Sequence, residues 1–161
     1  MPSPQPFRID VPDETLKRIR AKVAGYTWHE MPHDGGWAYG TNLDYVKELC
    51  AYWLEEFDWR AQEAAINRFS HFTAPVEDID IHFIHERGSG PKPMPLLISH
   101  GWPGSVIEFL NVIEPLAHPE RFNGHEDDAF DVIAPSLPGY GFSGRPPRPI
   151  GPRKVAGFFA D

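Results

Sequence analysis

The sequence has a single cysteine, no long apolar run and no cluster of basic residues. Cys50 is the only cysteine among 161 residues, so the chain cannot form an internal disulfide, and no second thiol stands at a metal-ligand spacing. No stretch approaches the roughly 18 apolar residues that span a bilayer. The formal net charge is −8, from 15 basic and 23 acidic residues. Without a patch of Lys and Arg to meet phosphates, nucleic acid is excluded as the expected partner.

The sequence also lacks an internal repeat and a secretory signal. The first ten residues, MPSPQPFRID, contain no apolar core. We therefore expect a soluble, cytoplasmic protein in which Cys50 is a buried structural thiol. Hydrophobic residues make up 41% of the chain, enough for a globular core. The 18 prolines and the 13% aromatic content indicate an irregular, enzyme-like surface rather than a helical bundle or a repeat array.

The first part of the chain has helical spacing. Pro12 suits the first turn of a helix with a Leu16, Ile19 and Val23 stripe. Thr41 or Asn42 can cap a second helix, and Asp58 a third. The patterns predict helices over 12–24, 43–57 and 59–68, with an aromatic-rich loop over 26–41.

From Val76 the apolar residues no longer recur at helical spacing but at every second position. VEDIDIHFIHER predicts a strand with one wetter face, and MPLLIS predicts a short strand covered on both faces. VIEFLNVIEPLA has helical spacing, HPERFNGHEDDA is a polar loop, and FDVIAP begins another buried strand. A strand–helix–strand order favours parallel pairing through a right-handed crossover. A further helix is expected to begin within RKVAGFFAD.

The tightest corner of the chain is His100-Gly101-Trp102-Pro103-Gly104-Ser105. In an α/β sheet, ligands lie beyond the carboxyl ends of the strands. This corner and the turn at 138–144 both follow such ends, so we expect them on the same side. A cis Trp102–Pro103 bond there could aim the Trp102 N–H into a cleft as an oxyanion donor, with His100 bracing the turn. Local spacing alone favours the alternative, in which Gly and Pro only provide the geometry of a tight corner.

Several segments, in order, resemble one enzyme family. HGWPGS is similar to the His-Gly-X-Pro motif of the epoxide hydrolases of the α/β-hydrolase superfamily, and FDVIAPSLPGYGFS resembles the segment that follows it. FRIDVPDETLKRIR, GWAYGTNLDYVKELCAYWLEEFDWR and DIDIHFIHERG resemble the N-terminal region of microsomal-type epoxide hydrolases. The resemblance covers roughly residues 6–144. It implies the opening part of an α/β-hydrolase sheet (74–161) preceded by a helical N-terminal extension (1–73).

The resemblance also implies a reaction. The family hydrolyses epoxides to vicinal diols with water and no cofactor or metal: a carboxylate on a nucleophile elbow forms an ester, which a histidine paired with an acid hydrolyses. Two cap tyrosines donate hydrogen bonds to the epoxide oxygen. Carried over to this sequence, the oxyanion donor is the backbone amide of Trp102, and His100, Gly101 and Pro103 complete its motif.

The sequence departs from the family pattern in three places, and one of them is the stretch RPIGPRKVAGFFAD at 148–161, which matches poorly. No G-x-[SD]-x-G elbow occurs in the chain. We expect the nucleophile, the catalytic histidine, its acid partner and the cap tyrosines downstream of Asp161, and we expect the isolated chain to be inactive. FSHF, at 69–72, replaces the family's usual Phe-Pro-Gln-Phe. Two alternatives stay open: a non-catalytic module or fragment that needs a complementing C-terminal chain, and a related dehalogenase or esterase.

Three further patterns carry structural expectations. Residues 139–144 match G-x-G-x-x-G. A dinucleotide site needs a helix that begins at this motif, and the prolines that follow are incompatible with such a helix. His82 and His85 form H-x-x-H in a strand, where they face opposite sides, so we expect exposed or edge histidines rather than metal ligands. The strand over 94–99 lacks a neighbour on one side, which predicts poor solubility or a homo-oligomer.

Overall fold

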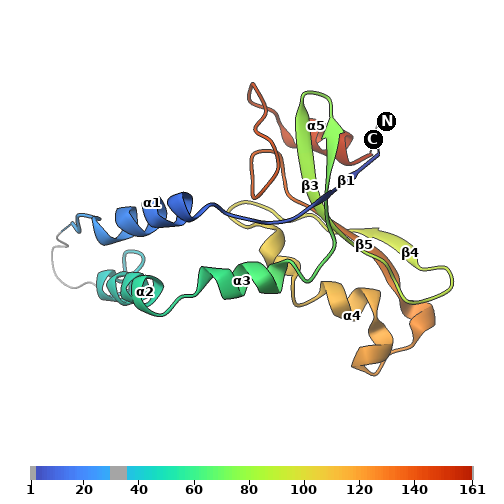
Figure 1. Cartoon of the computed structure of the whole chain (residues 1–161), viewed down its shortest axis with the longest axis horizontal. Helices are drawn as coiled ribbons and strands as arrows, with labels where there is room; N and C mark the ends of the chain where they lie inside the picture. The colour runs from blue at the N-terminus through green and yellow to red at the C-terminus, as the bar shows by residue number, and fades with distance from the viewer. Residues whose placement is uncertain (1–2, 30–35, 161) are drawn as a thin grey trace. The chain divides into compact units, whose positions relative to one another are not determined.

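The computed structural model describes residues 3–29 and 36–160 (Figure 1). They form two compact units: a sheet unit, which combines 3–9 with 64–160, and a helical unit, which comprises 10–29 and 36–63. The central part of the loop predicted over 26–41 and the terminal Asp161 lie outside the described residues. Within the described part, no helix has the length and hydropathy needed to cross a bilayer.

The sheet unit is built on five strands. In spatial order they are β1 (Gln5–Phe7), β2 (His71–Val76), β3 (Ile79–Glu86), β5 (Phe130–Pro135) and β4 (Met94–Leu97). The pairs β1–β2, β2–β3 and β3–β5 are antiparallel, and β4–β5 is parallel. The parallel pairing predicted for the strand–helix–strand unit is thus confirmed. The sequence reading missed β1 and β2, because one has three residues and the other contains Pro75, which interrupts its alternation.

Strand β3 is covered on both faces in its central part. The wetter face predicted for it is therefore wrong at His82 and Ile84, which are fully buried. The reason is its place between β2 and β5, with helices against both sides of the sheet. One core cluster contains Phe69, Ile84, Val106, Ile113, Ala117, Val132 and Ala134. The other contains Ile79, Ile81 and Phe158, the last from α5 (Pro152–Ala160), which confirms the helix expected near the end of the chain.

The helix predicted over 106–117 is divided in two. A 3-10 turn covers Val106–Phe109, and α4 covers Ile113–Ala117. Pro115 explains the break, because it has no N–H to donate and is tolerated only in the first turn of a helix. The predicted polar loop after α4 contains two more 3-10 turns, Pro119–Phe122 and Glu126–Asp128. The helical segment still buries Val106, Ile113 and Ala117 against the sheet.

Strand β4 lies at the edge of the sheet, and this corrects the prediction that it is covered on both faces. Met94 is 66% exposed and Leu97 is 45% exposed. The backbone N–H of Met94 donates to the carbonyl of Ala129, just before β5, and that of Ile98 donates to Ile133 in β5, so those of the alternate residues point to the open side. Pro95 is one of these alternate residues and has no N–H to offer there.

The helical unit contains α1 (Asp13–Ala24), α2 (Leu43–Glu55) and the first residues of α3 (Trp59–Ile66). The predicted caps are confirmed for Asn42, whose side chain accepts from Tyr45 N at 3.0 Å, and for Asp58, which accepts from Ala61 N at 3.1 Å. Cys50 is only half-buried, so the expectation of a buried thiol is wrong. The reason is that α2 has no fully buried residue.

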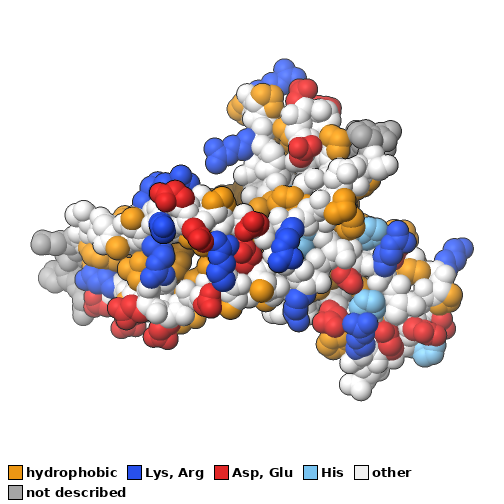
Figure 2. All heavy atoms as spheres, viewed as in Figure 1, with side chains coloured by type: hydrophobic (Ala, Val, Ile, Leu, Met, Phe, Trp, Pro, Cys, Tyr) orange, Lys and Arg blue, Asp and Glu red, His pale blue; other side chains and the backbone are white. Residues whose placement is uncertain are grey.

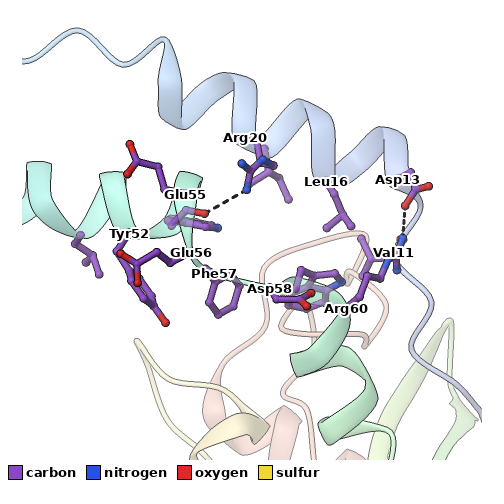
Figure 3. Close-up of a pocket in the computed structure, with 14 residues that line it drawn as sticks. Val11, Asp13, Leu16, Arg20, Tyr52, Glu55, Glu56, Phe57, Asp58 and Arg60 are labelled. Atoms are coloured by element: carbon purple, nitrogen blue, oxygen red, sulfur yellow. Dashed lines mark hydrogen bonds and ion pairs between the residues drawn. The ribbon is translucent and has the colours of Figure 1, made fainter.

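A cluster of polar side chains connects the first residues of α1 with α3. Glu63 Oε1 accepts from Val11 N at 2.7 Å and from Trp59 Nε1 at 3.1 Å, and Glu63 Oε2 accepts from Arg60 at 2.5 Å. Arg60 also pairs with Asp13 (Figure 3). Burial raises the pKa of the Glu63 carboxyl, but the Val11 N–H and the Arg60 guanidinium outweigh it, and the net pKa is lowered. The sequence patterns gave no indication of this cluster.

An open apolar hollow of about 840 Å³ lies between α1 and α2 (Figure 3). Its apolar lining includes half-exposed Leu49, Tyr52 and Trp53. Figure 2 shows hydrophobic side chains among charged ones over these two helices. All lining residues belong to the helical unit, and none belongs to the corner at 100–105.

Candidate functional site

The corner begins where β4 leaves the sheet. Ile98 N donates to Ile133 O at 2.9 Å, which extends the pairing by one residue. The Trp102–Pro103 peptide is cis, as predicted. Gly104 N donates to Gly101 O at 2.8 Å and closes a four-residue turn around this peptide. The backbone of the corner is therefore held by its own hydrogen bond.

His100 joins the corner to the turn after β5. Its side chain is buried, and Nε2 lies 3.0 Å from the backbone N of Leu137. Since Leu137 N–H can only donate, Nε2 is the acceptor, and the ring proton is on Nδ1, 3.1 Å from Gly101 O. The Tyr140 ring packs edge-on against His100 with centroids 5.5 Å apart. The corner and the turn thus lie together, as their positions at strand ends predicted.

Trp102 presents a backbone donor that the fold leaves free. Its side chain is 82% exposed, and its N–H donates no hydrogen bond to any residue in 3–29 or 36–160. Elsewhere in this corner the N–H of Gly104 and that of Ser105 are bonded, whereas those of His100 and Gly101, like that of Trp102, donate to no described residue. A fixed, unused amide is the kind of group that can stabilise a developing oxyanion.

The exit from the corner is fixed by a capping box. Ser105 N donates to Glu108 Oε1 at 2.9 Å, and Ile107 N donates to Ser105 Oγ at 3.4 Å. A Cβ on Gly104 would come 1.4 Å from Glu108 Oε1. Glycine is therefore needed at 104 for the cap, which agrees with the geometric reading of this residue.

The G-x-G-x-x-G segment forms a closed turn. Gly139 N donates to Gly144 O at 2.9 Å, and Gly144 N donates to Asp80 O at 2.7 Å. The next helix, α5, begins only at Pro152. The segment thus lacks the helix N-terminus that binds a pyrophosphate, and it serves instead to hold Tyr140 against His100.

The expectation of exposed or edge histidines is wrong for His82. This residue is 0% exposed, because β3 is an interior strand, and its ring bonds to His71 and Ser136. His85 is half-buried and packs 6.3 Å from the Phe72 ring. The described residues contain no group of three His, Cys, Asp or Glu side chains able to hold a metal ion. Sequence reasoning missed Leu137, Ser136 and His71. The only signal for any of them was the unusual FSHF segment at 69–72, which contains His71.

The serine hydroxyl groups near the corner are all engaged in hydrogen bonds. Ser105 caps the 3-10 turn, Ser99 donates to the His100 carbonyl, and Ser136 and Ser143 bond to His82. The arrangement can therefore stabilise a negative oxygen through Trp102, but it offers no free serine hydroxyl as a nucleophile.

The sheet with its corner defines the opening part of an α/β hydrolase: the sequence model described as alpha/beta hydrolase fold matches residues 94–160. The model described as Epoxide hydrolase N terminus matches residues 4–109, and the chain belongs to the epoxide hydrolase family.

Individual relatives agree with this assignment. Epoxide hydrolase 1 of Sus scrofa is 37% identical over 143 residues, which are 86% of this chain and 32% of that protein. An enantioselective mutant of the Aspergillus niger epoxide hydrolase has a TM-score of 0.85 at 31% identity, over 98% of this chain and 42% of that one. Juvenile hormone epoxide hydrolase from the silkworm Bombyx mori has a TM-score of 0.85 at 32% identity, and the match covers 98% of this chain and 38% of that one. The chain spans about a third of the length of such relatives.

Proposed function

We propose that this chain provides the oxyanion-stabilising corner of an epoxide hydrolase, which opens an epoxide to a vicinal diol through an ester intermediate. The unused backbone N–H of Trp102 carries the proposal, and membership of the family supplies the reaction class. The substrates are a small-molecule epoxide and water, and we expect no cofactor. The cytoplasmic location and the domain boundary at 73/74 stay predictions.

Hydrolysis of the ester places negative charge on a tetrahedral oxygen. A donor that is already fixed stabilises this charge without reorganising during the reaction, and one such donor contributes about 100- to 1,000-fold in rate. Two hydrogen bonds support this role for Trp102. The Gly101 carbonyl, which shares a peptide group with the Trp102 N–H, accepts from Gly104 N and from His100 Nδ1. In this proposal His100, Gly101 and Pro103 position the donor and do not touch the reacting atoms.

The attacking carboxylate comes, in this proposal, from outside these 161 residues. None of them stands in a G-x-[SD]-x-G elbow, and the serine hydroxyl groups at the corner are engaged. A further segment or a complementing chain would pair along the open edge of β4, which is exposed. That edge also supports the second candidate function, a non-catalytic module that binds a partner chain.

The proposal is tested with a chimera in which this chain replaces the matched segment of the Aspergillus niger enzyme. We expect the chimera to convert an aryl epoxide to its diol well above the water background, and the 161-residue chain alone to stay at background. A folded but inactive chimera would overturn the assignment to epoxide hydrolysis. Diol formation by the chain alone would overturn the claim that the nucleophile lies elsewhere.

A further inference from the structure

A buried chain of hydrogen bonds runs through two histidines of the sheet unit. His71 Nδ1, on β2, lies 3.0 Å from His82 Nε2, on β3. At the outer ends, His71 Nε2 lies 2.9 Å from the Ile66 carbonyl oxygen, and His82 Nδ1 lies 2.9 Å from Ser136 Oγ. The exposed fractions are 4% for His71 and 0% for both His82 and Ser136. The proposed active-site corner uses none of these groups directly.

The chain of bonds fixes where each proton lies. The Ile66 carbonyl can only accept, so His71 carries its proton on Nε2. His71 Nδ1 then accepts from His82 Nε2–H, and His82 Nδ1 accepts from the Ser136 hydroxyl. Every polar atom is satisfied while both rings are neutral. A proton added to one ring would bury a charge, and protons on both rings would also set the N–H groups of His71 Nδ1 and His82 Nε2 against each other.

The surroundings offer no compensating negative charge. Phe7 of β1 and Phe142 of the turn contact the His82 ring at centroid distances of 5.2 and 5.3 Å. Neither His71 nor His82 forms an ion pair with a described residue. Asp80 shares the strand face of His82, but its side chain is exposed, and His85 faces the other side.

Burial and proximity act in the same direction on both rings. Burial lowers the pKa of His71, although its bond to the Ile66 carbonyl opposes the shift. Burial first, and the neighbouring His71 second, lower the pKa of His82 to about 3. Both rings therefore stay neutral in the folded chain at pH values where an exposed histidine is charged.

Further hydrogen bonds of His82 and Ser136 tie the glycine-rich turn to the sheet. Ser143 Oγ accepts from His82 N at 2.9 Å and donates to the Ser136 carbonyl at 2.7 Å. Gly141 has a φ of 50°, and a Cβ there would come 2.8 Å from Ser136 Oγ. The turn therefore packs directly against Ser136. The residue after Ser136 is Leu137, whose N–H holds His100.

We propose that His71, His82 and Ser136 form an acid-sensitive latch: in its closed form both imidazoles are neutral, and it ties the turn, and through Leu137 and His100 the corner, to β2 and β3. The two rings take up protons only when the latch opens, so acid favours the open form. Glutamine at position 71 would keep both a donor and an acceptor but would not titrate. The inference does not depend on the proposed epoxide hydrolysis.

The first test is His71→Gln, with unfolding by urea followed from pH 7.5 to pH 5. In the wild type both rings take up a proton only on unfolding, so this pair lowers the folding constant by up to about 100-fold per pH unit below 6.5. In His71→Gln the corresponding loss is up to about tenfold. The control His29→Gln, at an exposed position, should change this slope far less. Equal slopes for His71→Gln and the wild type would overturn the latch.

The second test uses the wild-type chain and does not depend on any variant folding. Ring ¹⁵N NMR should show the Nε2–H tautomer for both His71 and His82, with no titration of His82 down to pH 5 and a lowered pKa for His71. A midpoint near 6.5 for either ring, or an Nδ1–H tautomer for His82, would overturn the proposal. Ser136→Ala should lower the exchange protection of the Leu137 amide at least tenfold at pH 7, and unchanged protection would refute the connection to the corner.

Discussion

The backbone N–H of Leu137 donates to Nε2 of His100 at 3.0 Å. This bond joins the carboxyl ends of β5 and β4, two parallel neighbours, just where the chain turns away from the sheet. The Nδ1 proton of the same ring is held by Gly101 O. One imidazole thereby sets the distance between the glycine-rich turn and the amide of Trp102.

Replacing His100 should loosen both segments. In His100→Ala the Leu137 N–H loses its acceptor in a buried region, which lowers the free energy of unfolding by about 1–3 kcal/mol. Urea unfolding at pH 7 measures this loss. His29→Ala, at an exposed position, is the matched control and should change stability by less than about 0.5 kcal/mol. Equal effects of the two variants would contradict the bridging role of His100.

The oxyanion assignment separates the backbone of Trp102 from its side chain. In the chimera with the Aspergillus niger enzyme, Trp102→Pro removes the N–H and should lower kcat about 100- to 1,000-fold. Trp102→Ala keeps the N–H, and since the indole is largely exposed, it should retain most of the activity. The donor would be misassigned if both variants lost kcat equally while remaining folded.

The buried carboxylate of Glu63 makes the helical unit sensitive to acid. Its pKa is lowered in the folded chain, so its contribution is present above the unfolded pKa near 4.5 and is lost as the pH falls through the folded value. Glu63→Gln should lower the free energy of unfolding by about 1–3 kcal/mol at pH 7, because the charge-assisted bond to Arg60 is lost. It should also flatten the pH dependence below pH 5, as measured by chemical unfolding. A variant that kept the wild-type slope would show that Glu63 is not responsible.

Two glycines should respond in opposite ways to alanine. Gly104→Ala forces Glu108 out of its bond to Ser105 N, so we expect a loss of about 0.5–2 kcal/mol from the broken cap. At Gly157, inside α5, a Cβ meets nothing within 4 Å, and Gly157→Ala should stabilise the chain by about 0.5–1 kcal/mol. Thermal unfolding of both variants gives the comparison, and stabilisation by Gly104→Ala would contradict the capping box.

The open edge of β4 predicts self-association of the 161-residue chain. The N–H groups of Leu97 and Ser99 point to the open side, and Leu97 is 45% exposed. Size-exclusion chromatography with light scattering should show oligomers whose share grows with concentration. Leu97→Lys should shift the chain towards monomer, whereas Tyr39→Lys, at an exposed position outside the sheet, should not. A monodisperse wild-type monomer at high concentration would rule out this use of the edge.

Much of the local structure follows from the sequence because short-range rules decide it. Asn42 and Asp58 cap helices through their own side chains, and the run Phe130–Pro135 is apolar enough to be a strand in any context. The motif around Trp102 could be placed because a strand, a glycine and a proline follow one another directly. These features need no knowledge of distant residues.

The errors arise where distant residues decide the outcome. His82 is polar in an alternating pattern, and only pairing on both sides by β2 and β5 makes its position interior. Its partners, His71 and Ser136, are far from it in sequence, and no periodicity links them. Leu137 was overlooked for a related reason: its role at the site depends on its backbone and not on its side chain. Pro115 is the opposite case. It is a local signal that breaks the helix, but the apolar spacing over 106–117 predicted one continuous helix.

The amide of Asn67 exchanges two hydrogen bonds with the backbone of Ile9, at 2.9 and 2.8 Å. Ile9 is buried and directly follows β1, which pairs with β2. Residues 10–63 are therefore an insertion into the sheet unit, and their two ends are clamped beside each other. During synthesis β1 leaves the ribosome before β2, and it can pair with β2 only after the whole insertion has been synthesised. The same clamp makes the insertion a candidate for excision or grafting through a short linker, with the host sheet left in register.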